Sequence, residues 1–63
     1  MIGTNMGILD KSGAAAYLST SARRVDELRR AGRLLAVLDG REFKFRVADL
    51  DDYIESLPLS VEV

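Results

Sequence analysis

The stretch SARRVDELRRAG, residues 21–32, decides the fold, because it predicts where one helix begins, which side it buries and where it ends. Ser21 is a good N-cap, since its hydroxyl can accept a hydrogen bond from a free amide of the first turn. Val25 and Leu28 are spaced to share one side of a helix. Gly32 can take the left-handed conformation that commonly follows a last helical turn. The stretch therefore predicts a short helix with four arginines and a narrow apolar stripe.

Another short helix is predicted just before this stretch. Asp10 can cap it, and Ala14, Ala15 and Leu18 then fall on one face, where small side chains allow a second helix to approach closely. The polar residues 19–21 interrupt the helical pattern. Two helices joined by so short a turn form the helix-turn-helix pattern.

A β-hairpin is expected after the second helix. Residues 34–38 and 41–46 flank Asp39-Gly40, a dipeptide that tolerates positive φ and favours a two-residue type I′ turn. In the second arm, Phe43 and Phe45 alternate with charged residues. The alternation predicts one buried face and one solvated, mostly basic face.

The last unit, VADLDDYIESLP at residues 47–58, has the pattern of an amphipathic helix that Pro58 helps to end. Its apolar residues recur at helical spacing: Val47, Leu50, Ile54 and Leu57. Acidic residues gather near its start, where the helix dipole favours them: Asp49, Asp51 and Asp52. This cluster lacks the loop and glycine of a calcium site, so no metal is expected.

These units predict an α+β fold, mostly helical, with the architecture of a winged helix-turn-helix: two helices, a two-stranded β-hairpin wing and a C-terminal helix. A chain of 63 residues makes one small domain. We place the domain at residues 9–57, between a flexible N-terminal tail at 1–8 and a flexible C-terminal tail at 58–63.

Charge is distributed unevenly along the chain. Between Arg23 and Arg46 there are eight basic residues against four acidic ones, a local net charge of +4, whereas the rest has one lysine against six acids, a net of -5. The whole-chain charge of -1 therefore hides a basic helix and wing beside an acidic final helix. A basic stripe is the electrostatic signature of phosphate binding.

A helical wheel of the second helix points its basic residues outward when Val25 and Leu28 face the core, with Arg29 nearer the packed edge. The expected DNA-binding residues of this helix are Ser21, Arg23, Arg24, Glu27 and Arg30. The expected phosphate and wing contacts are Arg29, Arg33, Arg41, Lys44 and Arg46. Arg23 and Arg24 are the candidates for reading guanine in the major groove.

Two simpler interpretations stay open for these residues. The pairs Arg23/Glu27 and Asp26/Arg30 are spaced i, i+4 and can be ordinary solvated ion pairs. The aromatic residues can stack on single-stranded bases, although their spacing favours a place in the core: Phe43, Phe45 and Tyr53.

An enzyme is not expected, because the chain has no histidine and no cysteine and shows no catalytic motif. No cofactor and no small-molecule substrate are expected either. The longest apolar runs are far shorter than the ~20 residues of a membrane helix, and no signal-peptide pattern opens the chain, so a cytoplasmic location is expected.

The run ILDKSGAAAYLSTSARRVDELRRAGRLLAVLDGREFKFRVADLDDYIESL, residues 8–57, resembles the excisionase and MerR-type group of small winged helix-turn-helix domains. The shared features are an alanine-rich helix ending in Tyr-Leu, Gly-Arg-Leu before the wing, and a final Asp-Leu-Asp-x-Tyr-Ile helix. The absence of a long dimerisation helix and an effector domain favours the excisionase branch. The resemblance implies a recombination directionality factor, encoded by a phage or mobile element of a bacterium, that binds repeated attachment sites, bends the DNA and directs an integrase toward excision.

The partners expected from this interpretation are double-stranded DNA, an integrase and further copies of the chain, assembled head to tail through their opposite charges. Two other functions stay open. The same fold suits a small phage or plasmid transcriptional regulator, and a winged helix can also act as a protein-interaction module without DNA.

Overall fold

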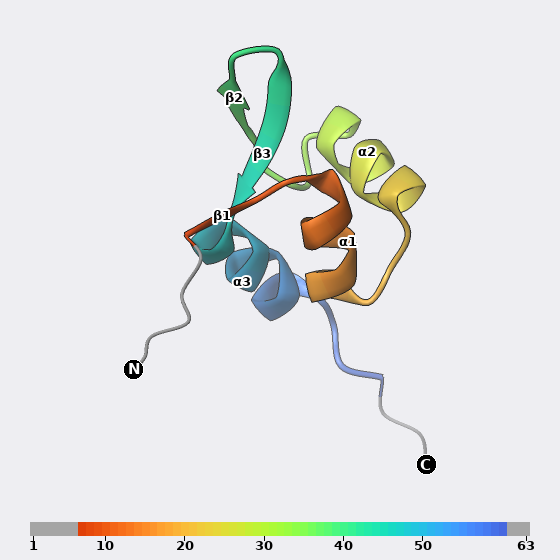
Figure 1. Ribbon diagram of the computed structural model, residues 1–63. Helices are drawn as coiled ribbons and strands as arrows, with labels where there is room; N and C mark the ends of the chain where they lie inside the picture. The colour runs from red at the N-terminus through yellow and green to blue at the C-terminus, as the bar shows by residue number, and fades with distance from the viewer. Residues whose placement is uncertain (1–6, 61–63) are drawn as a thin grey trace.

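This computed structural model describes residues 7–60 of the chain. They form three helices and a three-stranded antiparallel sheet (Figure 1). The order is β1 (Ile8–Leu9), α1 (Lys11–Leu18), α2 (Ala22–Arg30), β2 (Val37–Asp39), β3 (Glu42–Arg46) and α3 (Val47–Ser56). The α+β class expected from the sequence is confirmed. Among the described residues, no helix is long and apolar enough to cross a bilayer.

Both predicted caps are present at the starts of α1 and α2. The Asp10 carboxylate accepts a hydrogen bond from the Gly13 amide at 2.7 Å, and the Ser21 hydroxyl accepts one from the Arg24 amide at 3.0 Å. Ser19 has a left-handed backbone with φ of 57°, which ends α1 and turns the chain toward α2. The three-residue connection at 19–21 is thus the one that the sequence predicts.

Helix α2 ends at Arg30, and Gly32 follows in the left-handed conformation with φ of 75°, as predicted. The amides of Gly32 and Arg33 donate to the carbonyls of Arg29 and Leu28, at 3.0 and 2.9 Å. These bonds satisfy the last carbonyls of the helix and turn the chain toward the hairpin.

The sheet has one strand more than the two that the sequence predicts. Its order is β1-β3-β2, with Ile8 opposite Arg46 on one side of β3 and Val37 opposite Lys44 on the other. The prediction was wrong because a two-residue strand shows no periodicity. Ile8 belongs to the segment 1–8 that the sequence predicts as a flexible tail; residues 1–6 of that segment and residues 61–63 of the C-terminal tail lie outside the described part.

The hairpin turn also differs from the prediction. Asp39 pairs with Glu42 at the end of the ladder, so the two turn residues are Gly40 and Arg41 rather than Asp39-Gly40. Only Gly40 has a positive φ, 65°, whereas a type I′ turn requires a positive φ at both central positions. The first arm is shorter than expected as well, since residues 34–36 precede strand β2.

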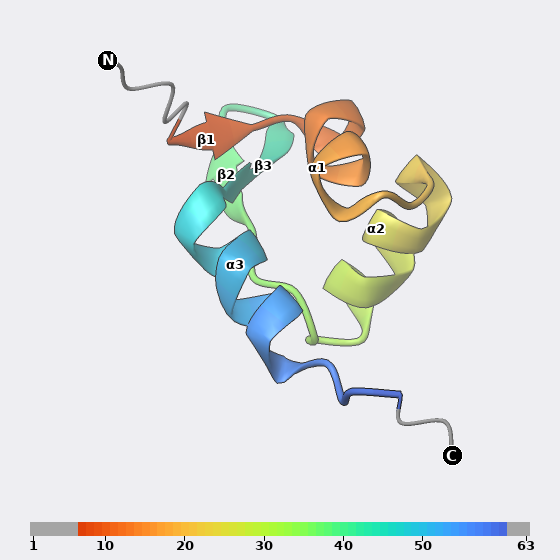
Figure 2. The ribbon, with the colours of Figure 1, turned by 90° about the horizontal axis from the view of Figure 1, so that it is seen from below.

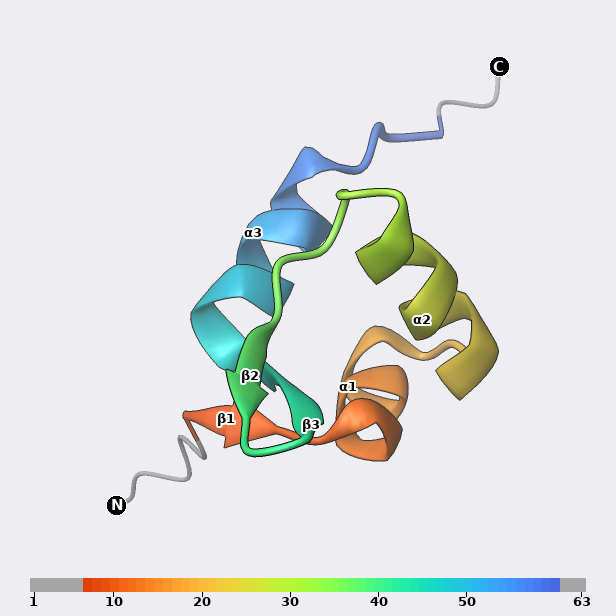
Figure 3. The same ribbon diagram turned by 90° about the horizontal axis from the view of Figure 1, so that it is seen from above.

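The core lies between the helices and the inner face of the sheet. Its fully or almost fully buried residues are Ala14, Ala15, Val25, Leu28, Leu34, Phe45 and Leu50. Val25 and Leu28 therefore face the core as predicted. The views from below and above show α2 and α3 on opposite sides of the molecule (Figures 2 and 3).

Three of the apolar residues expected in the core are not buried. Ile54 and Leu57 are each 42% exposed, because α3 turns Leu50 inward and lays Tyr53 beside the core instead. Phe43 is also 42% exposed, although it shares a strand face with the fully buried Phe45. The reason is its position farther out along a hairpin that projects beyond the helices (Figure 1).

Candidate nucleic-acid interface

The predicted basic residues lie on two elements, helix α2 and the hairpin β2–β3. On α2, Arg23, Arg24 and Arg30 are exposed, with 90%, 50% and 69% of their side chains accessible. Ser21 precedes them, but its hydroxyl is occupied by the cap of α2. One side of this helix therefore presents guanidinium groups to solvent at both ends.

The two arginines of the first turn share one carboxylate. The Arg23 Nε and the Arg24 Nη1 each lie 3.5 Å from an oxygen of Glu27. Both contacts are long and solvent-exposed, which makes them weak. Glu27 was expected among the DNA-binding residues, and the structure places it between the two arginines.

Asp26 joins three cations from two helices. Its carboxylate lies 2.9 Å from Arg30 Nη2, 3.1 Å from Arg29 Nη2 and 3.7 Å from Lys11 Nζ. The hydrogen bond from Arg29 lowers the pKa of Asp26, burial opposes this effect, and the charges of Arg30 and Lys11 add to it. The expected Asp26/Arg30 pair is thus part of a larger cluster.

Arg29 points toward the hairpin rather than outward. Its guanidinium carbon lies 4.0 Å from the centre of the Phe43 ring, and only 21% of its side chain is exposed. The Nε is buried and has no hydrogen-bond partner among the described residues. This cation is held between α2 and β3, unlike the other arginines of the helix.

The cations of the hairpin differ in how they are paired. Lys44 Nζ contacts Asp39 at 3.1 Å and Glu42 at 3.6 Å, and the bond to Asp39 is the main cause of its raised pKa. Arg46 Nε binds Asp49 of α3 at 2.7 Å. Arg41, in the turn, forms no ion pair with a described carboxylate.

Strand alternation separates these cations. Phe43 and Phe45 share the inner face of β3, so Lys44 and Arg46 point to the opposite face, away from α2. Arg33 lies beyond α2, with its guanidinium 5.9 Å from the Tyr53 ring and no described carboxylate in contact. The predicted site residues therefore do not form one continuous surface: α2 and the hairpin tip carry one group, and the outer face of β3 carries another.

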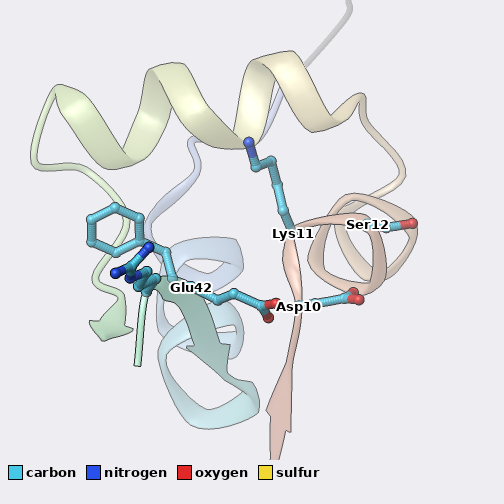
Figure 4. A pocket seen from close by; sticks show the side chains of 6 residues that line it. Asp10, Lys11, Ser12 and Glu42 are labelled. Carbon is cyan, nitrogen blue, oxygen red and sulfur yellow. The ribbon is translucent and has the colours of Figure 1, made fainter. Parts of the chain in front are cut away.

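A groove of about 340 Å³ lies between the start of α1 and the hairpin tip. It is lined by Asp10, Lys11, Ser12, Arg41, Glu42 and Phe43. Figure 4 shows Glu42 extending toward Asp10 and Lys11 extending toward α2. Because its two carboxylates and two cations balance, the groove favours no ligand of one charge.

Sequence reasoning missed Lys11 and Phe43 as neighbours of the arginine helix. Both are distant from Arg29 in the chain, and no local spacing rule connects residues of different elements. The one signal was the position of Arg29 near the packed edge of the helical wheel.

No protein-family model matches this chain, and no curated protein was found to be similar to it. Among the described residues, no group of three or more acidic residues is arranged to hold a metal ion.

Proposed function

We propose that this protein binds double-stranded DNA through a winged helix-turn-helix, with α2 in the major groove and the β2–β3 hairpin as the wing. The observation that carries the proposal is the row of exposed guanidinium groups on α2: Arg23, Arg24 and Arg30. The short connection from α1 to α2, followed by a hairpin and a third helix, is compatible with this fold.

The ion pairs on α2 oppose DNA binding only weakly. An exposed pair contributes only about 0–1 kcal/mol, and the contacts of Arg23 and Arg24 with Glu27 are both 3.5 Å long. A bidentate arginine contact with guanine contributes roughly 1–3 kcal/mol of discrimination. Arg23 and Arg24 can therefore exchange Glu27 for a base edge with a net gain.

Arg30, Arg33 and Arg41 are assigned to the phosphates. Arg33 and Arg41 have no described carboxylate to leave before they contact DNA. Lys44 and Arg46 face the other side of the sheet and are tied to carboxylates, so we assign them a contribution through the overall field.

Fluorescence anisotropy with labelled duplexes tests DNA binding. We expect the affinity to fall linearly with salt on logarithmic axes, and Arg33→Ala to reduce that slope by about 0.9, the value of one phosphate contact. Arg46→Ala is the matched control, since it removes an arginine that is paired with Asp49 and is not assigned a phosphate contact. Affinity that does not depend on salt would contradict the proposal and favour a protein-interaction module.

Sequence reading is tested with one substitution at each end of α2. Arg23→Ala should reduce discrimination between sequences by about 1–3 kcal/mol, whereas Arg30→Ala should weaken binding to all sequences alike. Glu27→Gln should raise the affinity for any duplex, because it frees both first-turn arginines. Equal effects of Arg23→Ala on all sequences would exclude a reading role.

The specific role that we propose is that of an excisionase-type architectural factor in a bacterial cytoplasm, supported by the resemblance of residues 8–57. A single α2 and one hairpin offer a small contact area, so several copies on adjacent sites would be needed to bend DNA. An integrase-dependent excision assay with and without the protein tests this role. Unchanged excision, together with repression of a promoter, would favour the transcriptional regulator.

Head-to-tail assembly on DNA is proposed from the position of α3. Helix α3 lies across the molecule from α2 (Figure 2), and it carries three exposed acidic residues: Asp51, Asp52 and Glu55. A neighbouring copy could place its basic residues against them. Gel shifts on multi-site DNA should show cooperative occupancy that Asp52→Asn weakens; independent filling of the sites would refute the assembly.

A further inference from the structure

We propose that Arg29 is a positioning residue that fixes the angle between α2 and the hairpin. It would thereby set the spacing at which the two elements meet a duplex, an inference that rests on the proposed function. The helical pattern predicts a phosphate contact for Arg29, whereas the geometry points to a different role.

The first observation is that Arg29 is held on two sides. Its Nη2 donates to Asp26 on its own helix at 3.1 Å, and its guanidinium carbon lies 4.0 Å from the centre of the Phe43 ring on β3. Asp26 is itself held by Lys11 of α1 at 3.7 Å. Arg29 thus links the two helices of the N-terminal half to the hairpin.

The second observation concerns what else supports the outer part of the hairpin. Phe45 is fully buried and anchors the base of β3, but Phe43 is 42% exposed and Leu38, its partner across the ladder, is 65% exposed. The core therefore does not hold the hairpin beyond Phe45. The contact between Arg29 and Phe43 is positioned to do so.

The third observation is the buried Nε of Arg29, which has no hydrogen-bond partner among the described residues. A buried donor without a partner carries a desolvation penalty that an outward-pointing arginine would avoid. The side chain keeps this position because the ring and the carboxylate together offset the penalty. To reach a phosphate, Arg29 would have to give up both.

The part of the hairpin beyond Phe45 is long enough for a small tilt to affect DNA contacts. From Phe45 to Arg41 the strand and turn extend about 13 Å at the usual rise per residue. A tilt of about 15° at Phe45 would move the Arg41 backbone by roughly 3 Å, which is enough to break a hydrogen bond. Loss of the Arg29 contact would thus misplace the hairpin tip without unfolding the core.

Residual dipolar couplings of the DNA-free protein test the orientation directly. In Arg29→Ala and in Phe43→Leu, we expect the amide couplings of the hairpin to shrink or change. The couplings of the helices should still fit one common alignment tensor and the unchanged helix positions. Arg30→Ala is the matched control, because it removes a neighbouring arginine that shares Asp26 but not the ring. Unchanged hairpin couplings in both variants would overturn the inference. If Arg29→Ala does not fold, Phe43→Leu removes the same contact from its exposed side.

Salt-dependent binding separates positioning from phosphate contact. We expect Arg29→Ala to bind about 3- to 30-fold more weakly, in line with the loss of a partly buried cation–π contact. The salt slope should fall only through the misplaced Arg41, so Arg29→Ala should not change it further in an Arg41→Ala background. Arg30→Ala should instead lower the slope by about 0.9. The losses of binding free energy caused by Arg29→Ala and by Arg41→Ala should combine less than additively. A displaced hairpin tip no longer places Arg41 against the duplex, so removing Arg41 then costs less.

A slope that Arg29→Ala reduces further in the Arg41→Ala background would show a phosphate contact of Arg29 itself and overturn the inference. If the unmodified protein binds no duplex, the proposed function is wrong, whereas the dipolar couplings still decide whether Arg29 orients the hairpin.

Discussion

At the scale of single residues, two neighbouring carboxylates organise the cations of α2. Glu27 lies 3.5 Å from each first-turn arginine, and Asp26 gathers Arg29, Arg30 and Lys11. Their surroundings differ: the side chain of Asp26 is 20% exposed and that of Glu27 is 48% exposed. Asp26 thus mainly stabilises the fold, whereas Glu27 mainly affects how easily Arg23 and Arg24 leave their ion pairs to contact DNA.

We expect Asp26→Asn to lower stability at neutral pH, because Arg29 and Lys11 lose their shared carboxylate. The pKa of Asp26 is lowered in the folded protein, chiefly by Arg29. Its contribution is therefore fully present above the ordinary pKa of about 3.9 and disappears as the pH falls through the lower, folded value. Urea unfolding of both proteins, from neutral pH down to about pH 2, should show the two midpoints converging. A constant difference at all pH values would contradict this.

Ser21→Ala should destabilise the domain by about 1 kcal/mol, because the amide of Arg24 loses its cap. In a domain of this size that corresponds to a fall in Tm of roughly 4–8 °C. Thermal unfolding followed by circular dichroism measures it. Ser21→Asn keeps a capping oxygen and should stay close to the original Tm; an equal loss in both variants would show that the cap is not the cause.

At the scale of elements, α3 shows how spacing and burial can diverge. The apolar residues at 47, 50, 54 and 57 form a stripe on a helical wheel. Of these, only Leu50 is fully buried, and Ile54 and Leu57 lie at the edge of the core. The short sheet and the two other helices cover only the first half of this stripe.

The two halves of α3 should respond differently to truncation. Leu50→Ala is expected to cost about 2–5 kcal/mol, which equals most of the roughly 3–5 kcal/mol available to so small a domain. Ile54→Ala, on the same helix, should change stability by about 0.5 kcal/mol or less. Chemical denaturation checks both, and a comparable loss in the two variants would show that the rim is packed as tightly as the core.

The sequence predicted the elements whose signals are local. Asp10 and Ser21 are caps, Gly32 ends α2, and Val25 with Leu28 face the core, all of which follow from neighbouring residues. Strand β1 and the exposure of Phe43 could not be predicted, because both depend on where β3 lies in space. The same holds for the site: exposed arginines follow from a helical wheel, but the contact of Arg29 with Phe43 joins two elements that no spacing rule relates.

At the scale of the whole molecule, one polar contact joins the first helix to the last. The Tyr17 hydroxyl donates to the Asp51 carboxylate at 2.6 Å, linking α1 to α3 on the outside of the core. Together with the cluster around Asp26, it ties α1 to both neighbouring helices.

Tyr17→Phe should reduce stability at neutral pH. The hydrogen bond to Asp51, with some help from burial, raises the pKa of Tyr17 in the folded protein. Its contribution is therefore complete below the ordinary value of about 10 and is lost as the pH rises through the folded value. Thermal unfolding of both proteins between neutral pH and about pH 11 should show their Tm values approaching each other. A gap that widens with pH would rule out this assignment.

The strand order β1-β3-β2 has a consequence for behaviour at high concentration. The longest strand, with five residues, is shielded between neighbours of two and three residues, so within residues 7–60 only very short segments of backbone are left open at the margins of the sheet. Such margins are poor templates for adding strands from other molecules. The fold thus limits fibre formation through the shortness of its edge strands.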